Sequence, residues 1–351
     1  WVKLLQNRME TGEPYLMFED AVNAELPDFQ KRKGLYVNHS NLCSEITLAT
    51  NEERTAVCCL SSVNLEYYDE WKNVPAFIPD LVRMLDNVLQ HFIDHAPNEM
   101  ERAKYSASRE RSIGLGAMGY HAYLQRNNIS FESMFASGSN YQMFKHIKDH
   151  ALQETRKLAV ERGACPDDDT CEVRNAHLLA IAPNASSSII CGNTSPSIEP
   201  FRANAFTQKT KSGSFLQKNK YLEKLLESKG ANTDTVWKDI ITNKGSVQHL
   251  DILTSEEKEV FKTAVEINQS WVIEHAAQRQ EFICQSQSVN LFFPPDVNKA
   301  DLHNIHMLAW AKNLKTLYYL RSEAISRADN VSNKVKREII FEQEGCLSCE
   351  G

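Results

Sequence analysis

The sequence lacks the features that mark membrane, secreted or low-complexity proteins. Its 351 residues contain no internal repeat, and no apolar run approaches the ~20 residues that a membrane-spanning helix needs. Residues 1–20 do not show the basic-then-apolar order of a secretory signal peptide. We therefore expect a cytoplasmic protein without a membrane partner.

Positive charge is also scarce. The chain has 39 Lys and Arg against 46 Asp and Glu, a formal net charge of -7. This balance argues against a surface that grips a nucleic-acid polymer, but not against a local phosphate site. The 42% hydrophobic and 24% charged residues are typical of a soluble enzyme. The length suffices for two domains or for one large α/β unit.

The nine cysteines are too dilute for a disulfide scaffold. In a cytosolic chain they are more often structural, metal-binding or catalytic. The first residue is Trp1 rather than Met. We expect either that a segment has been removed or that the chain is part of a longer polypeptide.

Helical periodicity dominates much of the chain. Apolar residues recur at helical intervals over 79–95 and 140–162, which predicts two packed amphipathic helices. Thr254 and Glu257 have the spacing of a capping box. We expect this box to open one long helix over 254–279.

Short apolar runs predict only a few strands. Residues 289–293 and 314–320 are such runs, and a helical pattern over 301–313 separates them. This order predicts a β-α-β unit with parallel strands and a right-handed crossover. The Ser-, Asn- and Pro-rich stretch 181–199 predicts loops around a short strand. Residues 322–351 are charged and sparsely apolar, so we expect a mobile tail there.

The segment NLCSEI places an amide, a thiol and a carboxylate at alternate positions: Asn41, Cys43 and Glu45. On an extended backbone such side chains point the same way, so the three would converge on one small volume. The group would combine a hydrogen-bonding amide, a redox-active sulfur and a proton acceptor. The spacing also fits the commoner case of a loop with one buried cysteine and two solvated polar residues.

Cys58 and Cys59 lie in the apolar, strand-like run VCCLSSVNL. Neighbouring side chains of a strand face opposite ways, so at most one of the two can face a given site. The simpler interpretation is a pair of small core residues.

The run RSIGLGAMGY contains Gly114, Gly116 and Gly119 in the spacing of a dinucleotide-binding fold. That fold needs a hydrophobic strand before the glycines and an acidic residue about 20 positions later. Here the preceding SASRER is polar, and Glu132 comes too early. We therefore interpret the glycines as sites of close helix packing.

Two further patterns have ordinary alternatives. In NASSS, residues 184–188, backbone amides and hydroxyls could hold a phosphate, although Ser-rich turns are common. In LKTLYYL, Tyr318 and Tyr319 are adjacent in an apolar strand. Packing is the usual role of such a pair, and redox use of the phenols is the unusual one.

The chain ends in GCLSCEG, where Cys346 and Cys349 form a C-x-x-C pair. Such a pair can be half of a zinc site or a dithiol that cycles with a disulfide. Cys165 and Cys171 are poor candidates for the two further zinc ligands, because their spacing is unusual and they are distant in sequence. A dithiol on a flexible tether needs no other residue, so we favour it and predict no metal site.

Taken in order, NLCSE, VCCLS, PNASSS, SIEP, KTLYYLR and a terminal C-x-x-C closely resemble the C-terminal half of the large, catalytic subunit of class I ribonucleotide reductase. The resemblance runs from Trp1 to Gly351, and the tail is most similar to the eukaryotic-type and viral branch. It implies an α/β fold, in which residues 1–321 form the C-terminal half of a ten-stranded α/β barrel with added helices. Residues 322–351 would form a flexible redox tail.

The resemblance also implies residue roles. Cys43 would be the thiyl radical that takes the 3′-hydrogen of a ribonucleoside diphosphate, Glu45 the general base on the 3′-hydroxyl, and Asn41 a ligand of the ribose hydroxyls. Tyr319, the outer of the two tyrosines, and then Tyr318 would pass the radical to Cys43. The substrate would also contact the rest of the loop and the phosphate segment, namely Leu42, Ser44, Pro183, Asn184, Ala185, Ser186 and Ser187.

Three further cysteines complete the implied cycle. Cys58 would be one of the two cysteines that reduce the 2′-carbon, whereas Cys59 would be structural. Cys346 and Cys349 would re-reduce the resulting disulfide and would themselves be restored by thioredoxin or glutaredoxin.

The resemblance places the effector-binding domain, part of the phosphate site and the partner of Cys58 in a preceding N-terminal half. We expect this chain to bind no cofactor directly and to be inactive alone. It would need that half, ATP or deoxynucleotide effectors bound there, and a metal-containing small subunit that supplies the radical. The completed large subunit would be a homo-oligomer. The alternative is a stand-alone thiol–disulfide or zinc-binding protein that uses the terminal cysteine pair.

Overall fold

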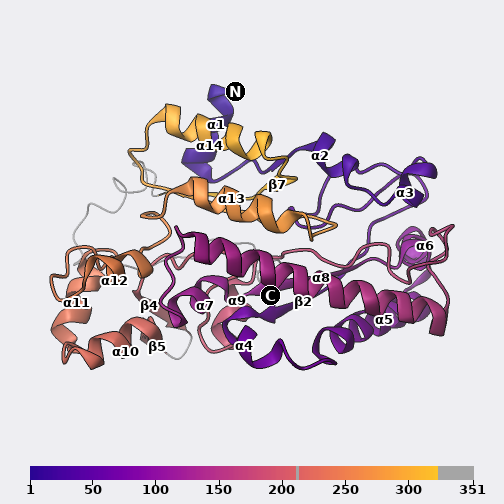
Figure 1. The fold of residues 1–351 in the computed structure, drawn as a ribbon. Helices are drawn as coiled ribbons and strands as arrows, with labels where there is room; N and C mark the ends of the chain where they lie inside the picture. Colours follow the sequence, from indigo (N-terminus) through magenta and orange to yellow (C-terminus); the bar gives the residue numbers. More distant parts are fainter. Residues whose placement is uncertain (211–212, 323–351) are drawn as a thin grey trace.

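The computed structural model describes residues 1–210 and 213–322 and combines many helices with short strands. In Figure 1 the helices lie in layers, with α14 and α13 above the long α8 and with α5 below it. The α-helices are α1 Val2–Thr11, α2 Glu19–Ala24, α3 Asp28–Arg32, α4 Tyr68–Trp71, α5 Phe77–His95, α6 Glu101–Glu110, α7 Tyr120–Arg126, α8 Met134–Arg162, α9 Ala185–Ile190, α10 Lys220–Ser228, α11 Asp234–Thr242, α12 Ser255–Val260, α13 Gln269–Gln280 and α14 Lys299–Ala311.

The strands are short and pair two by two. They are β1 Leu16–Met17, β2 Cys59–Asn64, β3 Ile113–Met118, β4 Ala205–Thr210, β5 Gly213–Lys218, β6 Leu291–Phe293, β7 Thr316–Leu317 and β8 Leu320–Ser322. Two 3₁₀ turns, Leu65–Tyr67 and Asn98–Met100, precede α4 and α6. β1 pairs antiparallel with β7, and β4 pairs antiparallel with β5.

Parallel pairing connects the segments that carry the predicted site residues. β2 pairs with β3 in parallel. Parallel bridges then join Leu115 of β3 to Leu179, and Ile181 to Gln287. β6 pairs in parallel with β8. Successive segments thus run side by side in one direction, and within residues 1–210 and 213–322 no sheet closes into a barrel.

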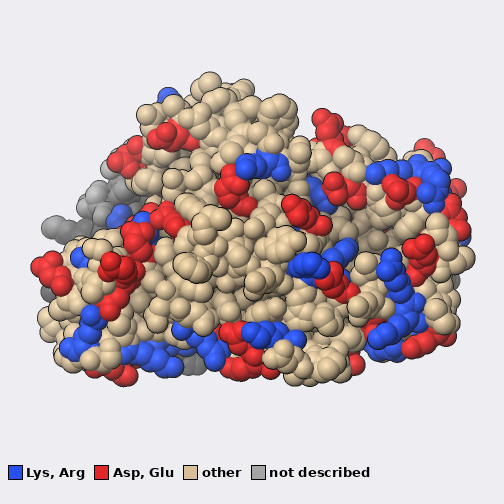
Figure 2. Space-filling view, in the orientation of Figure 1, with Lys and Arg blue, Asp and Glu red and all other residues tan. Residues whose placement is uncertain are grey.

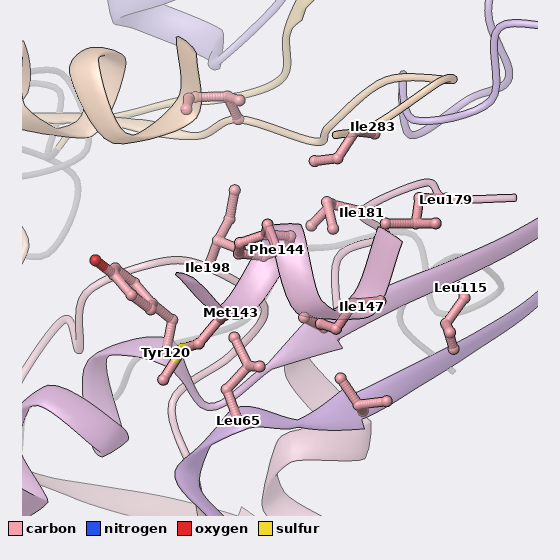
Figure 3. Close-up of a cluster of buried hydrophobic side chains, with 14 of the residues drawn as sticks. Leu65, Leu115, Tyr120, Met143, Phe144, Ile147, Leu179, Ile181, Ile198 and Ile283 are labelled. Carbon is pink, nitrogen blue, oxygen red and sulfur yellow. The ribbon is translucent and has the colours of Figure 1, made fainter. Parts of the chain in front are cut away.

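The main core lies between α8 and these parallel segments. Figure 3 shows Met143, Phe144 and Ile147 of α8 among buried side chains from the segments opposite, including Leu115 and Ile181. A second, separate core lies around Trp237 and joins α10, α11 and α12 to β4. Apolar burial therefore builds one large unit and one smaller helical lobe.

Several predicted elements are confirmed. The helices predicted over 79–95 and 140–162 are α5 and α8, and α8 begins earlier because the Ser133 side chain caps it by accepting the Ala136 amide. The β-α-β unit is confirmed in part: β6 and β8 are parallel and α14 lies between them in the chain, but most of the predicted second strand, 314–320, is not in β8, because Thr316–Leu317 form β7, which pairs antiparallel with β1.

The single helix predicted over 254–279 is wrong. The capping box at Thr254 is present, but α12 ends at Val260 and α13 begins only at Gln269. Between them, the Glu266 carboxylate accepts the Thr263 amide at 2.7 Å, and the Asn268 side chain caps α13. These side chains compete with the helical hydrogen bonds of the backbone, so the chain turns instead of continuing the helix.

The short strand predicted within 181–199 is also wrong, because Ala185–Ile190 form α9. The apolar residues there do not enter a sheet, and Ile190 is exposed. The tail predicted from residue 322 begins one residue later at the earliest, since Ser322 ends β8. Residues 323–351, with Cys346 and Cys349, lie outside the described residues.

The prediction that the glycines of RSIGLGAMGY serve helix packing is wrong. Gly114 and Gly116 lie within β3. A Cβ at Gly114 would stand 2.4 Å from the Leu60 side chain, and one at Gly116 would stand 2.5 Å from the Ala180 carbonyl oxygen. The glycines thus allow close approach of neighbouring segments of the sheet.

The surface has no single-sign region on the face shown in Figure 2, where acidic and basic side chains are intermixed. No helix in the described part of the chain is both long and apolar enough to cross a membrane.

Candidate active site

The NLCSEI segment forms a tight turn rather than an extended strand. The Ser44 amide donates to the Asn41 carbonyl at 3.2 Å, and Ser44 has a left-handed φ of 71°. The turn still buries the thiol and the carboxylate, because Cys43 is 3% exposed and Glu45 is 2% exposed. Leu42, a predicted substrate contact, is exposed. Cys43 and Glu45 are thus both buried within one turn, while the convergence of the thiol and the carboxylate on one substrate stays a prediction.

Glu45 lies in a buried, polar setting. Burial raises the pKa of its carboxyl group, and hydrogen bonds with the Asn41 and Ser288 side chains partly offset that rise. A carboxyl group with a raised pKa is a better proton acceptor when it is ionised. The Asn41 and Glu45 side chains therefore interact, which agrees with the predicted convergence of these two residues.

Ser288 links the two catalytic candidates and was missed by the sequence analysis. Its hydroxyl lies 2.5 Å from the Cys43 carbonyl oxygen and 3.3 Å from Glu45 Oε2. The hydroxyl has one hydrogen, so it donates to one oxygen at a time, and the carbonyl is the nearer acceptor. Nothing in the local sequence QSQSVN indicates this link, because it joins segments 243 residues apart.

The Tyr318 hydroxyl donates to Cys43 Sγ over 3.6 Å. Tyr318 is 3% exposed, whereas Tyr319 is only partly buried. Their ring centroids are 4.4 Å apart. The predicted order, with Tyr319 outside and Tyr318 beside Cys43, is the order in the structure.

A third tyrosine joins this pair. The Tyr15 ring centroid lies 4.6 Å from that of Tyr318 and 4.8 Å from that of Tyr319. The sequence analysis missed Tyr15 because it lies about 300 residues from the pair and belongs to no motif. The Arg321 guanidinium carbon lies 3.9 Å from the Tyr319 ring centroid, a close cation–π contact.

Burial keeps the phenols of Tyr318 and Tyr15 protonated. Desolvation, and then the hydrogen bond to Cys43, raise the pKa of Tyr318, and desolvation with a hydrogen bond to Tyr319 raises that of Tyr15. A phenol that does not ionise must lose its proton together with its electron when it is oxidised. The cluster therefore favours transfer of hydrogen atoms.

Cys58 and Cys59 face opposite sides, as strand parity predicts. Cys58 packs beside Ile46 and Leu48, close to the NLCSEI turn, whereas Cys59 packs against the main core. The Gln285 side-chain amide donates to Cys58 Sγ at 3.3 Å. Burial raises the pKa of Cys58, so its sulfur is held as the neutral thiol.

The predicted phosphate segment, residues 183–187, lies close to the Ser288 segment of the candidate site. The Ser288 amide donates to the Ile181 carbonyl at 2.9 Å, two residues before Pro183. Pro183 and Asn184 are buried, and Ala185, Ser186 and Ser187, in the first turn of α9, are partly exposed. Asn184 Oδ1 accepts the Ser62 hydroxyl at 3.3 Å.

Metal binding and the redox tail remain predictions. No group of three or more His, Cys, Asp or Glu side chains suited to a metal ion occurs in the described part of the chain. Because Cys346 and Cys349 lie outside it, the dithiol and zinc alternatives for that pair both stay open.

Comparisons with known proteins match this arrangement. The family model described as "Ribonucleotide reductase, barrel domain" matches residues 1–170 and 168–320. The "Ribonucleoside-diphosphate reductase large subunit" of Invertebrate iridescent virus 3 is 49% identical over 354 residues, which cover 100% of this chain and 56% of the viral protein. The "Putative ribonucleoside-diphosphate reductase large subunit" of Frog virus 3 (isolate Goorha) is 48% identical, over 100% of this chain and 62% of that protein.

A solved structure gives the same result. The "Actinobacillus ureae class Id ribonucleotide reductase alpha subunit" superposes with a TM-score of 0.87 and 44% sequence identity, covering 92% of this chain and 60% of that one. The chain thus spans somewhat more than half the length of these relatives. The fold and the resemblance predicted from the sequence are confirmed, and the chain belongs to the ribonucleotide reductase family, whose barrel domain it matches over residues 1–320.

Proposed function

We propose that this chain is the C-terminal portion of a ribonucleoside-diphosphate reductase large subunit and that Cys43 carries its thiyl radical. The observation that carries the proposal is the 3.6 Å approach of the Tyr318 hydroxyl to Cys43 Sγ, with the buried Glu45 carboxylate in the same turn. A structural cysteine does not require a protonated phenol beside it. A thiol that exchanges a hydrogen atom with a tyrosine does.

The radical enters through the tyrosines. When the Tyr318 phenoxyl radical takes the hydrogen atom of Cys43, an O–H bond forms, an S–H bond breaks and the unpaired electron moves to the sulfur. Tyr319 supplies Tyr318 in the same way, which fits the close contact of their rings. Tyr15 packs against both rings and would hold them in place.

The substrate step uses the NLCSEI turn. The Cys43 thiyl radical takes the 3′-hydrogen atom of the ribose, and Glu45 takes the proton of the 3′-hydroxyl. The 2′-hydroxyl then leaves as water with a proton from one of the two reducing thiols. After the 2′-carbon has been reduced, the hydrogen atom returns from Cys43 to the 3′-carbon. Asn41, which pairs with Glu45, is placed to hold the ribose hydroxyls.

Reduction of the 2′-carbon needs two electrons from a pair of thiols. Cys58 is one of the pair, and the other belongs to the N-terminal portion of the protein. Their oxidation to a disulfide balances the reduction, and Cys346 and Cys349 restore the dithiol by exchange before thioredoxin or glutaredoxin reduces them in turn. The substrate phosphates would be held by the amides and hydroxyls of residues 183–187.

The partners follow from this cycle. The N-terminal portion completes the barrel and binds the ATP or deoxynucleotide effectors. A metal-containing small subunit generates the radical, and the substrate is a ribonucleoside diphosphate. The protein acts in deoxyribonucleotide synthesis for DNA replication, as a cytoplasmic homo-oligomer.

The test is formation of deoxyribonucleotide by the complete large subunit mixed with its small subunit and a dithiol reductant. Cys43→Ser should reduce turnover by about 1000-fold or more, because serine cannot form a radical of comparable energy. Cys171→Ser, at an exposed thiol outside the proposed site, is the matched control and should retain activity. Turnover that survives Cys43→Ser would overturn the proposal.

A further inference from the structure

A buried polar cluster is centred on Cys284, next in the chain to Gln285 and Ser286, which contact Cys58 and Glu45. The backbone amides of Leu178 and Leu179 donate to Cys284 Sγ at 3.0 and 3.3 Å. The Leu179 carbonyl, the acceptor available to a neutral thiol, is farther away at 3.7 Å. A thiol sulfur is a weak acceptor, so two amides at these distances suit a thiolate.

His177 completes a pair with this sulfur. Its Nε2 lies 2.9 Å from Gln30 Oε1, and the Gln30 amide nitrogen donates to Glu110. Because that Gln30 oxygen can only accept, Nε2 must donate, which leaves Nδ1 for the sulfur. His177 is fully buried, its Nδ1 makes no regular hydrogen bond, and the side chain interacts with the Cys284 thiol, whose pKa it lowers.

Positive charge surrounds the same sulfur. The Lys315 ammonium is buried and donates to the carbonyls of Ile283, Cys284 and Gln285 at 3.1, 3.0 and 2.9 Å. Burial opposes ionisation of Cys284, but the Lys148 ammonium, the His177 hydrogen bond and the Leu178 amide together hold the pKa of the thiol well below its usual value.

We propose that Cys284 and His177 form a thiolate–imidazolium pair that is a site of covalent oxidation by hydroperoxides. The pair has the parts of an activated nucleophile: a sulfur, a base in contact with it, and Gln30, which orients the base. Cys284 is partly exposed, so a small peroxide can reach it.

The reaction balances within these groups and one hydroperoxide. The thiol proton passes to His177, and the thiolate then attacks one peroxide oxygen, so that an S–O bond forms and the O–O bond breaks. The sulfur loses two electrons and becomes a sulfenic acid, while the peroxide is reduced to hydroxide or alkoxide. The His177 imidazolium gives its proton to that leaving group.

The site lies next to the proposed active site along the chain. Gln285, the next residue, donates to Cys58, and Ser286 donates its amide to the Glu45 carbonyl. A modification at Cys284 is therefore one residue from the group that contacts Cys58 and two residues from the group that contacts Glu45. The proposal does not depend on the reductase assignment, because its measurements follow the thiol and not turnover.

The experiment measures alkylation of each cysteine by iodoacetamide across pH, in the complete protein, with peptide mass spectrometry. At about pH 6.5, Cys284 should react about tenfold faster than the exposed Cys191, because each unit of lowered pKa raises the thiolate fraction about tenfold. Dilute hydrogen peroxide followed by dimedone should label Cys284 before Cys191. These measurements need no variant.

Variants then separate the pair from simple burial. His177→Gln should lower the rate at Cys284 by about tenfold or more at the same pH, and His39→Gln, at an exposed histidine, should leave it unchanged. The proposal is overturned if Cys284 does not react under native conditions, or if its rate rises with pH along the same curve as that of Cys191.

Discussion

Cys58 and Cys284 lie on opposite sides of Gln285, and their sulfur atoms have different environments. On the active-site side, Cys58 packs beside Ile46 and Leu48 and receives one hydrogen bond, from Gln285. On the other side, Cys284 receives two backbone amides and faces His177. Burial raises the pKa of the first thiol, and the polar groups lower that of the second.

The difference teaches that burial alone does not decide whether a sulfur ionises. A neutral thiol is needed where the chemistry moves hydrogen atoms, as proposed for Cys43, and a thiolate is needed where it moves electron pairs. Chain segments only a few residues apart supply each setting. Most of the variants below change the surroundings of one cysteine, and the measurements test whether the other cysteine is affected.

The largest effect is expected at Tyr318. Tyr318→Phe removes the hydroxyl that donates to Cys43 Sγ, and should lower turnover by about 1000-fold. Tyr15→Phe keeps the ring that packs on both tyrosines and should cost less than about tenfold. Alkylation of Cys284 should be the same in both variants. Equal losses of turnover in the two variants would mean that ring packing, and not the hydroxyl, is what matters.

Lys315 should matter for stability on the Cys284 side. Lys315→Met leaves three buried carbonyls without their donor and should lower the free energy of unfolding by about 3 kcal/mol. Lys312→Met, at an exposed lysine paired with Glu274, should change it by about 0.5 kcal/mol or less. Urea unfolding measures both. Similar values for the two would show that the Lys315 cluster is not a stabilising unit.

Two buried histidines resemble Cys58, because burial is the largest influence on the pKa of each. Burial lowers the pKa of His121 and of His275 from 6.5 to about 3. Between these values the unfolded chain binds more protons than the folded one, so stability should fall as pH decreases below 6.5. Each histidine should contribute up to about 1.4 kcal/mol per pH unit. Unfolding free energies that stay constant from neutral pH to about pH 4 would contradict this.

The smallest effect is expected at Gln285 itself. Gln285→Leu removes the donor that partly offsets the raised pKa of Cys58. Alkylation of Cys58 at alkaline pH should therefore slow by less than about tenfold. The Cys284 rate should not change, because its donors come from the Leu178 segment. Parallel changes at both cysteines would show that the two sides are not separate.

Local patterns predicted the parts of the site that lie within one segment. The positions of Cys43 and Glu45, the order of Tyr318 and Tyr319 and the opposite faces of Cys58 and Cys59 all followed from spacing or from the family resemblance. Ser288, Gln285 and Tyr15 could not be found this way, because each contacts the site from a distant segment. The Cys284–His177 pair is likewise invisible in sequence, since 106 residues separate Cys284 from the Leu178 amide beside His177.

The fold shows the same limit. The strong periodicity of α5 and α8 and the β-α-β order were predictable. The break between α12 and α13 was not, because the local side chain of Glu266 acts there together with the distant Glu132, which accepts the Asn268 amide and pairs with Lys262. The helix α9 was mistaken for loops and a strand because six residues carry little periodicity.

The central claim is that Tyr318 hands the radical to Cys43, and a trap at position 318 tests it most directly. Tyr318 would be replaced by 3-aminotyrosine, which is oxidised more easily, in the complete large subunit mixed with its small subunit, substrate and effector. Electron paramagnetic resonance should show an aminotyrosyl radical that appears as the small-subunit radical decays, and that is lost in the Tyr319→Phe background. A small-subunit radical that persists unchanged, with no aminotyrosyl radical, would contradict the account.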